Sequence, residues 1–148
     1  AIFRRRQVGL IYQFYNLIPV LNVTENITLP VLMDGKKVDK AYLDELVGLL
    51  SLKGREKHLP NELSGGQQQR VSIGRALINN PAVMLADEPT GNLDSKNSHE
   101  ILELLKLSHK KYGQTLIVIT HDSNIALQAD RIITINDGKI ASDRLLVK

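Results

Sequence analysis

Val83-Met84-Leu85-Ala86-Asp87-Glu88 joins four uninterrupted apolar residues to two adjacent carboxylates. Leu116-Ile117-Val118-Ile119 is a second apolar run, and the segment from Ile101 to Leu107 between the two runs has the spacing of an amphipathic helix. Continuous apolar runs are typical of parallel strands that are buried on both faces. These segments predict a β-α-β unit and place the chain in the α/β class, with a mostly parallel sheet.

Strands are also predicted near both ends of the sequence. Val8-Gly9-Leu10-Ile11-Tyr12 is rich in β-branched and aromatic residues and predicts a buried strand that ends at Gln13. Ile132–Ile135 and Lys139–Ala141 predict a terminal hairpin, because the intervening Asp137-Gly138 suits a tight turn with positive backbone angles.

A helical layer is predicted between the first two strands. One helix is expected from a Thr24 cap to about Met33, with Pro30 bending or shortening it. Asp39 can cap a second helix, whose apolar positions from Leu43 to Leu50 follow a 3.6-residue period. This layer has a polar side of its own and forms an insertion into the α/β fold.

A third helix is predicted to begin at Ser64 and to stop at Pro81. Gly74 inside it costs about 1 kcal/mol relative to alanine unless close packing requires it. Its start, Leu63-Ser64-Gly65-Gly66-Gln67-Gln68-Gln69-Arg70, has capping-box spacing between Ser64 and Gln67. The exposed backbone N–H groups and the helix dipole make this start a candidate phosphate site, although an ordinary capped helix would have the same short pattern.

The carboxylates Asp87 and Glu88 follow a predicted strand at the sheet edge where α/β proteins place their ligand sites. Strand alternation points them to different tasks. One can organise a magnesium ion and the other can act on an attacking water. An acidic strand end in solvent is the alternative interpretation of these two residues alone.

Gln13 and His121 are predicted to end strands at the same edge. An amide can contact both a metal-bound water and a phosphate oxygen without adding charge. An imidazole there can bridge a transferred phosphoryl group and a carboxylate. With Asp87 and Glu88, these side chains supply the groups that phosphoryl transfer to water requires. The sequence contains no Gly-x-x-x-x-Gly-Lys-Ser/Thr, so the lysine that holds the β and γ phosphates is missing.

Composition narrows the possible partners. The 148 residues carry 19 basic and 16 acidic side chains, which gives no strong support for nucleic-acid binding. Arg4-Arg5-Arg6 is the only basic cluster and is interpreted as a solvated loop. The absence of cysteine excludes disulfides and thiolate metal sites. No apolar run approaches the roughly 20 residues that cross a bilayer, so a membrane role would require a partner.

These motifs together resemble those of the ATP-binding-cassette ATPases. Leu63 to Gln67 match the signature motif, Val83 to Glu88 match Walker B, Gln13 is similar to the Q-loop glutamine and His121 to the switch histidine. The segment Asn92-Leu93-Asp94 is similar to the D-loop. Three further segments resemble the subfamily that serves macrolide export, lipoprotein extraction, bacitracin-type resistance and cell division: Pro89 to Asp94, Leu17-Ile18-Pro19 and Glu25-Asn26-Ile27.

The resemblance implies a P-loop NTPase-like core that uses ATP and Mg²⁺. Two such domains close head to tail, so that Ser64, Gly65, Gly66 and Gln67 contact ATP held by the other copy, with Asp94 also near nucleotide. Asp87 and Gln13 would serve the metal, Glu88 the attacking water and His121 the γ-phosphate. The residues from Asn16 to Asn26 would meet an integral membrane permease with a large extracytoplasmic domain, at the cytoplasmic face of the cell membrane.

The same resemblance predicts a partial domain. Residues 14–80 would be the Q-loop and the helical, signature-bearing subdomain, and residues 81–148 would carry Walker B, the D-loop, the histidine and the C-terminal strands. Walker A and the N-terminal strands are missing, so a fragment boundary is expected at Ala1, and the chain alone is expected to be inactive. Two alternatives stay open: a non-hydrolysing module that docks on a permease, and a non-transport cassette ATPase.

Overall fold

The computed structural model describes residues 2–147, with Arg5 described by its backbone only. Ala1, where a fragment boundary is predicted, lies outside the described residues. Contacts divide the chain into one unit up to Val118 and a second unit from Ile119 onward. The larger unit contains a sheet and its helical layer, and the smaller one contains a short helix and a hairpin.

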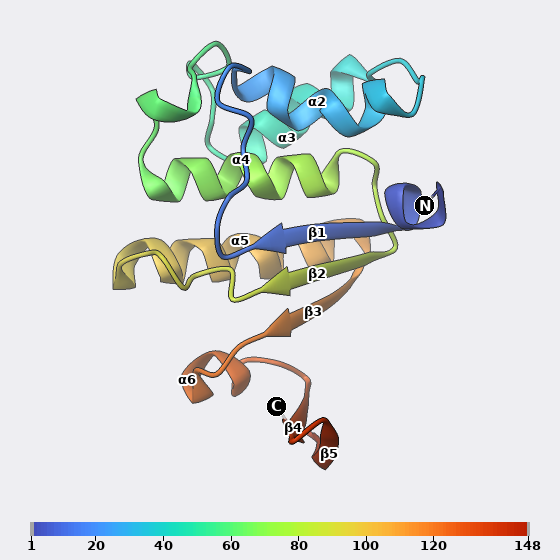
Figure 1. Ribbon diagram of the computed structural model, residues 1–148, viewed down its shortest axis with the longest axis vertical. Coiled ribbons are helices and arrows are strands. Elements are labelled where there is room, and N and C mark those ends of the chain that lie inside the picture. Colours follow the sequence, from blue (N-terminus) through green and yellow to red (C-terminus); the bar gives the residue numbers. More distant parts are fainter. Residues whose placement is uncertain (1, 148) are drawn as a thin grey trace. The chain divides into compact units, whose positions relative to one another are not determined.

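The sheet of the first unit has the strand order β1-β2-β3, with β1 at Val8–Tyr12, β2 at Val83–Asp87 and β3 at Thr115–Ile119. β1 and β2 are parallel, and the arrows of all three strands run the same way (Figure 1). The register pairs Tyr12 with Asp87. Gln13 and Glu88, which directly follow this pair on the two strands, therefore leave the sheet at the same edge.

Burial of the sheet is one-sided, which corrects the prediction that β2 and β3 are buried on both faces. Met84 and Ala86 of β2 belong to the core, whereas Val83 and Leu85 are only half-buried. On β3, Ile117 and Ile119 are 47% and 55% exposed. The residues that alternate with them on β3, Leu116 and Val118, pack against the hydrophobic core instead.

Three of the predicted helices in the first unit lie near their expected positions. The segment predicted from Ile101 to Leu107 is the middle of a longer helix, the helix at Ile2–Gln7 was not predicted, and one short 3₁₀ turn separates two of the helices. The bounds of these elements are α1 Ile2–Gln7, α2 Val23–Met33, α3 Lys40–Leu49, η1 Pro60–Glu62, α4 Gly65–Leu77 and α5 Ser95–Tyr112. Asp39 caps α3 as predicted.

Two local predictions were wrong. α2 is capped by Asn22 and not by Thr24, because Glu25 stands three residues after Asn22 and completes a capping box that Thr24 cannot form. The helix ends at Met33 as predicted, and Pro30 does not shorten it. The Arg4-Arg5-Arg6 cluster lies in α1 and not in a solvated loop, and Arg6 pairs with the nearly buried Asp34 at 2.9 Å.

The helical layer has a continuous apolar interior. Its fully buried members come from α2, α3, α4 and the turn after α3, and include Ile27, Leu46, Leu50, Leu52, Ile73 and Leu77. Asn26 is also fully buried, and its side chain bonds the N–H and C=O of Ile18 and the C=O of Leu21. The segment after Gln13 is therefore tied to α2 by one amide.

The second unit contains α6 (Ser123–Ala126) and the antiparallel strands β4 (Arg131–Asn136) and β5 (Lys139–Leu145). Asp137 and Gly138 have φ values of 50° and 73°, which confirms the predicted tight turn. Within residues 2–147, no helix has the length and apolar character needed to cross a membrane.

Candidate functional site

The first turn of α4 is built as the sequence predicts. Ser64 is the N-cap, its Oγ accepts from the Gln67 N–H at 3.2 Å, and Gln67 Oε1 accepts from the Ser64 N–H at 2.9 Å. This capping box leaves the Gly65 and Gly66 N–H groups at the positive end of the helix dipole. The turn can therefore bind an anion through backbone donors.

Both glycines of this turn lie close to side chains of other segments. A Cβ on Gly66 would lie 2.4 Å from Oδ1 of Asn97, and one on Gly65 would lie 3.0 Å from the hydroxyl of Tyr15. Asn97 belongs to the first turn of α5, so the starts of α4 and α5 are in direct contact. The first turn of α4, called the signature turn below, is therefore held both by its own cap and by contacts with Tyr15 and Asn97.

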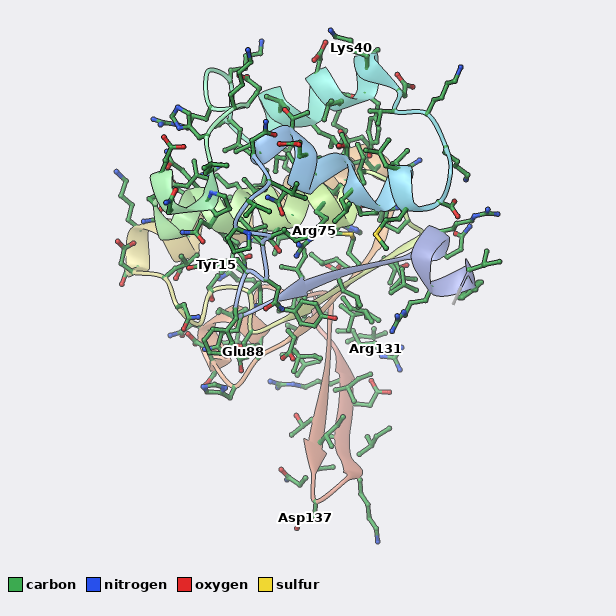
Figure 2. All side chains as sticks on the ribbon, turned by 45° about the horizontal axis from the view of Figure 1, so that its top comes forward. Tyr15, Lys40, Arg75, Glu88, Arg131 and Asp137 are labelled. Carbon is green, nitrogen blue, oxygen red and sulfur yellow. The ribbon has the colours of Figure 1, made fainter. Side chains whose placement is uncertain are left out.

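Asp87 and Glu88 lie at the end of β2 but differ in backbone conformation. Asp87 is the last residue of the strand and is exposed. Glu88, labelled in Figure 2, is half-buried and has φ = 47°, in the left-handed region that non-glycine residues seldom adopt. The expectation that simple strand alternation separates the two carboxylates therefore does not extend to Glu88. Strained backbone of this kind concentrates at functional sites.

Gln13 is fixed by the loop that follows Glu88. Its Nε2 donates to Asn92 Oδ1 at 3.3 Å, and Asn92 Nδ2 donates to the carbonyl of Gln13 at 3.0 Å. Gly91 packs against the same side chain, since a Cβ there would lie 2.6 Å from Nε2 of Gln13. The predicted Q-loop glutamine and the predicted D-loop therefore meet in this chain.

Gln69 joins these segments, although it was not predicted as a site residue. It is fully buried in α4, and its Nε2 donates to the carbonyls of Tyr12 at 3.2 Å and Pro89 at 2.5 Å. One amide thus ties the residue before Gln13 to the residue after Glu88. The signal was present, because Gln69 falls four residues before Ile73 on the buried face of the helix.

Arg75 holds the segment beyond Gln13 and was also missed. Its guanidinium donates to the carbonyls of Tyr15 at 2.9 Å and Asn16 at 2.7 Å, and Figure 2 labels Tyr15 and Arg75. Burial lowers the pKa of Arg75 from its ordinary value, but an arginine remains charged at neutral pH. The arginine therefore anchors a loop in which Asn16 has a positive φ of 53°.

Asp94 is the N-cap of α5. Its carboxylate accepts from the backbone N–H of Asn97 at 2.8 Å and from Asn97 Nδ2 at 3.1 Å. These hydrogen bonds lower the pKa of Asp94 and keep it ionised. A contact between Asp94 and nucleotide stays a prediction.

His121 belongs to the second unit, where it is exposed and precedes the Asp122 cap of α6. Its approach to the carboxylates also stays a prediction. The first unit does bring Gln13, Asp87 and Glu88 to one edge of the sheet. Separately, the capped first turn of α4 lies beside the start of α5. No group of three or more acidic, histidine or cysteine side chains among residues 2–147 forms a preset metal cluster.

Known proteins resemble both the sequence and this arrangement. The ABC transporter family model matches residues 2–91. The macrolide export ATP-binding/permease protein MacB of Mannheimia succiniciproducens is 50% identical over 142 residues, which cover 95% of this chain and 22% of that protein. The lipoprotein-releasing system ATP-binding protein LolD of Geobacter metallireducens is 43% identical over 145 residues, covering 97% of this chain and 64% of LolD.

A solved structure extends the likeness to three dimensions. The dimeric, post-hydrolysis ATP-binding cassette MJ0796 bound to ADP and Pi superposes with a TM-score of 0.82 at 41% identity, over 98% of this chain and 65% of that one. This confirms the predicted α/β cassette fold. The chain spans less than two thirds of each of these proteins. It belongs to the ABC transporter family and is similar to the MacB and LolD ATP-binding proteins within it.

Proposed function

We propose that this chain forms part of an ATPase that hydrolyses ATP as a head-to-tail dimer and drives a membrane permease. The observation that carries the proposal is the β1–β2 register, which delivers Gln13 and the Asp87-Glu88 pair to one edge of a parallel sheet. Ligands of open α/β sheets bind at this edge. The family relationship supplies ATP as the ligand class.

The side chains at this edge fit a magnesium ion. Mg²⁺ prefers oxygen ligands and is commonly held by one or two carboxylates together with substrate phosphates. Asp87 is an exposed carboxylate, and Gln13 adds an amide oxygen. When bound, the ion would offset charge on the phosphates. Asp87 and Gln13 are the residues that would hold it.

Glu88 is proposed as the group that accepts a proton from the attacking water. It follows Asp87 directly, and its positive φ is maintained by a turn in which the Gly91 N–H donates to the Glu88 carbonyl at 3.0 Å. Its carboxylate would orient the water and take up its proton. His121 is proposed to contact the γ-phosphate.

The signature turn is proposed to act on the ATP of a second copy. Ser64 is exposed, and Gly65 and Gln67 are half-exposed, so the helix start is open to an approaching ligand. Backbone donors at a helix N-terminus bind phosphate without a lysine. A dimeric relative is known, since the MJ0796 cassette has been solved as a dimer. Asp94 is proposed to lie near the same nucleotide.

The permease contact is proposed for the segment from Asn16 to Asn26, at the cytoplasmic face of the membrane. Ile18 and Val20 in this segment are 36% and 80% exposed, and Phe14 just before it is 70% exposed. The loop is nevertheless held in shape by Asn26 and Arg75. An exposed apolar surface on an ordered loop is suited to a protein partner.

The central test changes Glu88 to Gln in the full-length protein that carries this chain. The amide keeps the shape of the side chain but cannot accept the proton, so turnover should fall by at least about a hundredfold while ATP binding is retained. Radiolabelled ATP binding and phosphate release measure the two effects. Glu103→Gln is the matched control, since Glu103 is an exposed residue of α5. Turnover by Glu88→Gln near that of the control would remove Glu88 from its proposed role.

A further inference from the structure

Two amide side chains 79 residues apart form a reciprocal pair in this structure. Gln13 Nε2 donates to Asn92 Oδ1 at 3.3 Å, and Asn92 Nδ2 donates to the Gln13 carbonyl oxygen at 3.0 Å. Asn92 thus contacts both the side chain and the backbone of the same residue. These two hydrogen bonds by themselves define how the two amide groups face each other.

The backbone carbonyl decides the orientation of both amides. A carbonyl oxygen only accepts, so Asn92 must turn its Nδ2 toward Gln13 O. Its Oδ1 then faces the Gln13 side chain, which must present Nε2, its own donor end. The Oε1 atom of Gln13 is consequently turned away from Asn92, and it is the acceptor left to meet a metal ion or a metal-bound water.

The surroundings restrict Gln13 further. Gly91 leaves room for the side chain only because it lacks a Cβ, which would lie 2.6 Å from Nε2 and 2.7 Å from Cδ. The buried Gln69 amide donates to both Tyr12 O and Pro89 O, the residue before Gln13 and a residue three positions before Asn92. The segments that carry Gln13 and Asn92 are therefore held together independently of the amide pair.

We propose that Asn92 is a positioning residue that sets the amide orientation of Gln13, so that Oε1 is presented to the magnesium site. The inference rests on the proposed function for the role of Gln13. The contact itself rests on geometry alone. An aspartate at position 92 would accept from Nε2 but could not donate to Gln13 O, and an alanine would do neither.

The contact is tested first without nucleotide, in the full-length protein. Hydrogen exchange of the Gln13 side-chain amide, followed by NMR, should be several-fold slower in the wild type than in Asn92→Ala. Asn92 is exposed, so this variant should fold, and its melting curve checks that it does. Equal exchange rates in the two proteins would overturn the proposal.

The consequence is tested by a double-mutant cycle on ATP turnover. Asn92→Ala should lower kcat about tenfold and raise the Mg²⁺ concentration for half-maximal rate, with ATP affinity in EDTA unchanged. Gln13→Ala should act similarly, and the double variant should be no worse than Gln13→Ala. Asn92→Asp should not restore the rate. Lys96→Ala, an exposed change in the first turn of α5, should leave kcat unchanged.

Two results would contradict the positioning role. One is that Asn92→Ala lowers kcat by the same factor in the Gln13→Ala background, because Asn92 would then act without Gln13. The other is an equal loss of ATP affinity in EDTA, which would indicate a general structural effect. A wild-type protein that lacks ATP turnover would instead refute the proposed function, and the exchange experiment would still decide the Gln13–Asn92 contact.

Discussion

Gly74 shows how one residue can reconcile helix propensity with packing. Alanine is favoured over glycine inside a helix by about 1 kcal/mol, which argues against glycine at this position. A Cβ on Gly74, however, would lie 2.7 Å from Cδ1 of Leu50 and 3.1 Å from Cδ1 of Ile27. Both neighbours are fully buried, so neither can move aside freely. The close packing that would justify this glycine is present.

Replacing Gly74 by alanine is therefore expected to destabilise the protein. Overpacking of a buried site costs about 1–3 kcal/mol, which exceeds the gain in propensity. Gly48→Ala in α3 is the matched control, because Gly48 is exposed and a Cβ there meets only Lys53 Cε at 3.7 Å. It should stabilise by about 0.5–1 kcal/mol. Urea unfolding of both variants measures the difference, and equal stabilities would show that the α2–α3–α4 interface is loosely packed.

The starts of the helices depend on short capping patterns, and some of these patterns are easier to recognise in the sequence than others. Ser64 with Gln67 and Asn22 with Glu25 both form capping boxes. Thr24 is a suitable cap by residue type, but of the two residues only Asn22 has an acidic partner three positions later that accepts from its own N–H. Residue type alone therefore misplaced the start of α2, whereas spacing would have placed it correctly.

The β4–β5 hairpin carries an ion pair that should make it sensitive to acid. Arg131 donates to both carboxylate oxygens of Asp143, at 2.8 and 2.6 Å, and these hydrogen bonds lower the pKa of Asp143 from its ordinary value of 3.8. A carboxyl whose pKa is lower in the folded state stabilises that state above the unfolded pKa. The contribution is lost as the pH falls through the lowered value.

We therefore expect hairpin order to be constant above about pH 4 and to decline below it. Amide exchange of β4 and β5 residues as a function of pH measures this. Asp143→Asn should remove the decline. Asp137→Asn, at the turn labelled in Figure 2, should keep it, because asparagine also accepts a positive φ. An unchanged decline in Asp143→Asn would mean that another group controls the acid response.

At the scale of the whole molecule, large apolar side chains remain accessible on both units. On the sheet of the first unit, Ile117 is 47% exposed. On the hairpin, Ile135, Ile140 and Leu145 are 64%, 68% and 76% exposed. Open strand faces and edges of this kind favour pairing with another chain.

The 148-residue chain, produced by itself, is therefore expected to associate and to bind an apolar dye. Light scattering and dye fluorescence measure the two properties. Replacing Ile135 and Ile140 together by serine should reduce dye binding without changing the helical content, because both residues lie on exposed parts of the hairpin. A monomer with sharp cooperative melting and no dye binding would contradict the expectation.

The sequence by itself determined the α/β class, the order of the motifs, the strands at Val8–Tyr12 and Val83–Ala86, and the turn at Asp137-Gly138. These features depend on apolar periodicity and on caps and turns that span a few residues, so local chemistry is sufficient to predict them. The signature turn belongs with them, since Ser64 and Gln67 satisfy each other within one helical turn.

The tertiary structure alone decided the contacts that shape the site. The Gln13–Asn92 pair, the bridge that Gln69 makes between two strand ends, and the positive φ of Glu88 were not predicted. Each depends on the register of β1 against β2 and on the path of the loop after β2, which bring together residues up to 79 positions apart. Hydrogen bonds over such separations are set by how whole elements pack. Helical spacing places Gln69 on the buried face of α4, but it does not say which carbonyls the side chain bonds.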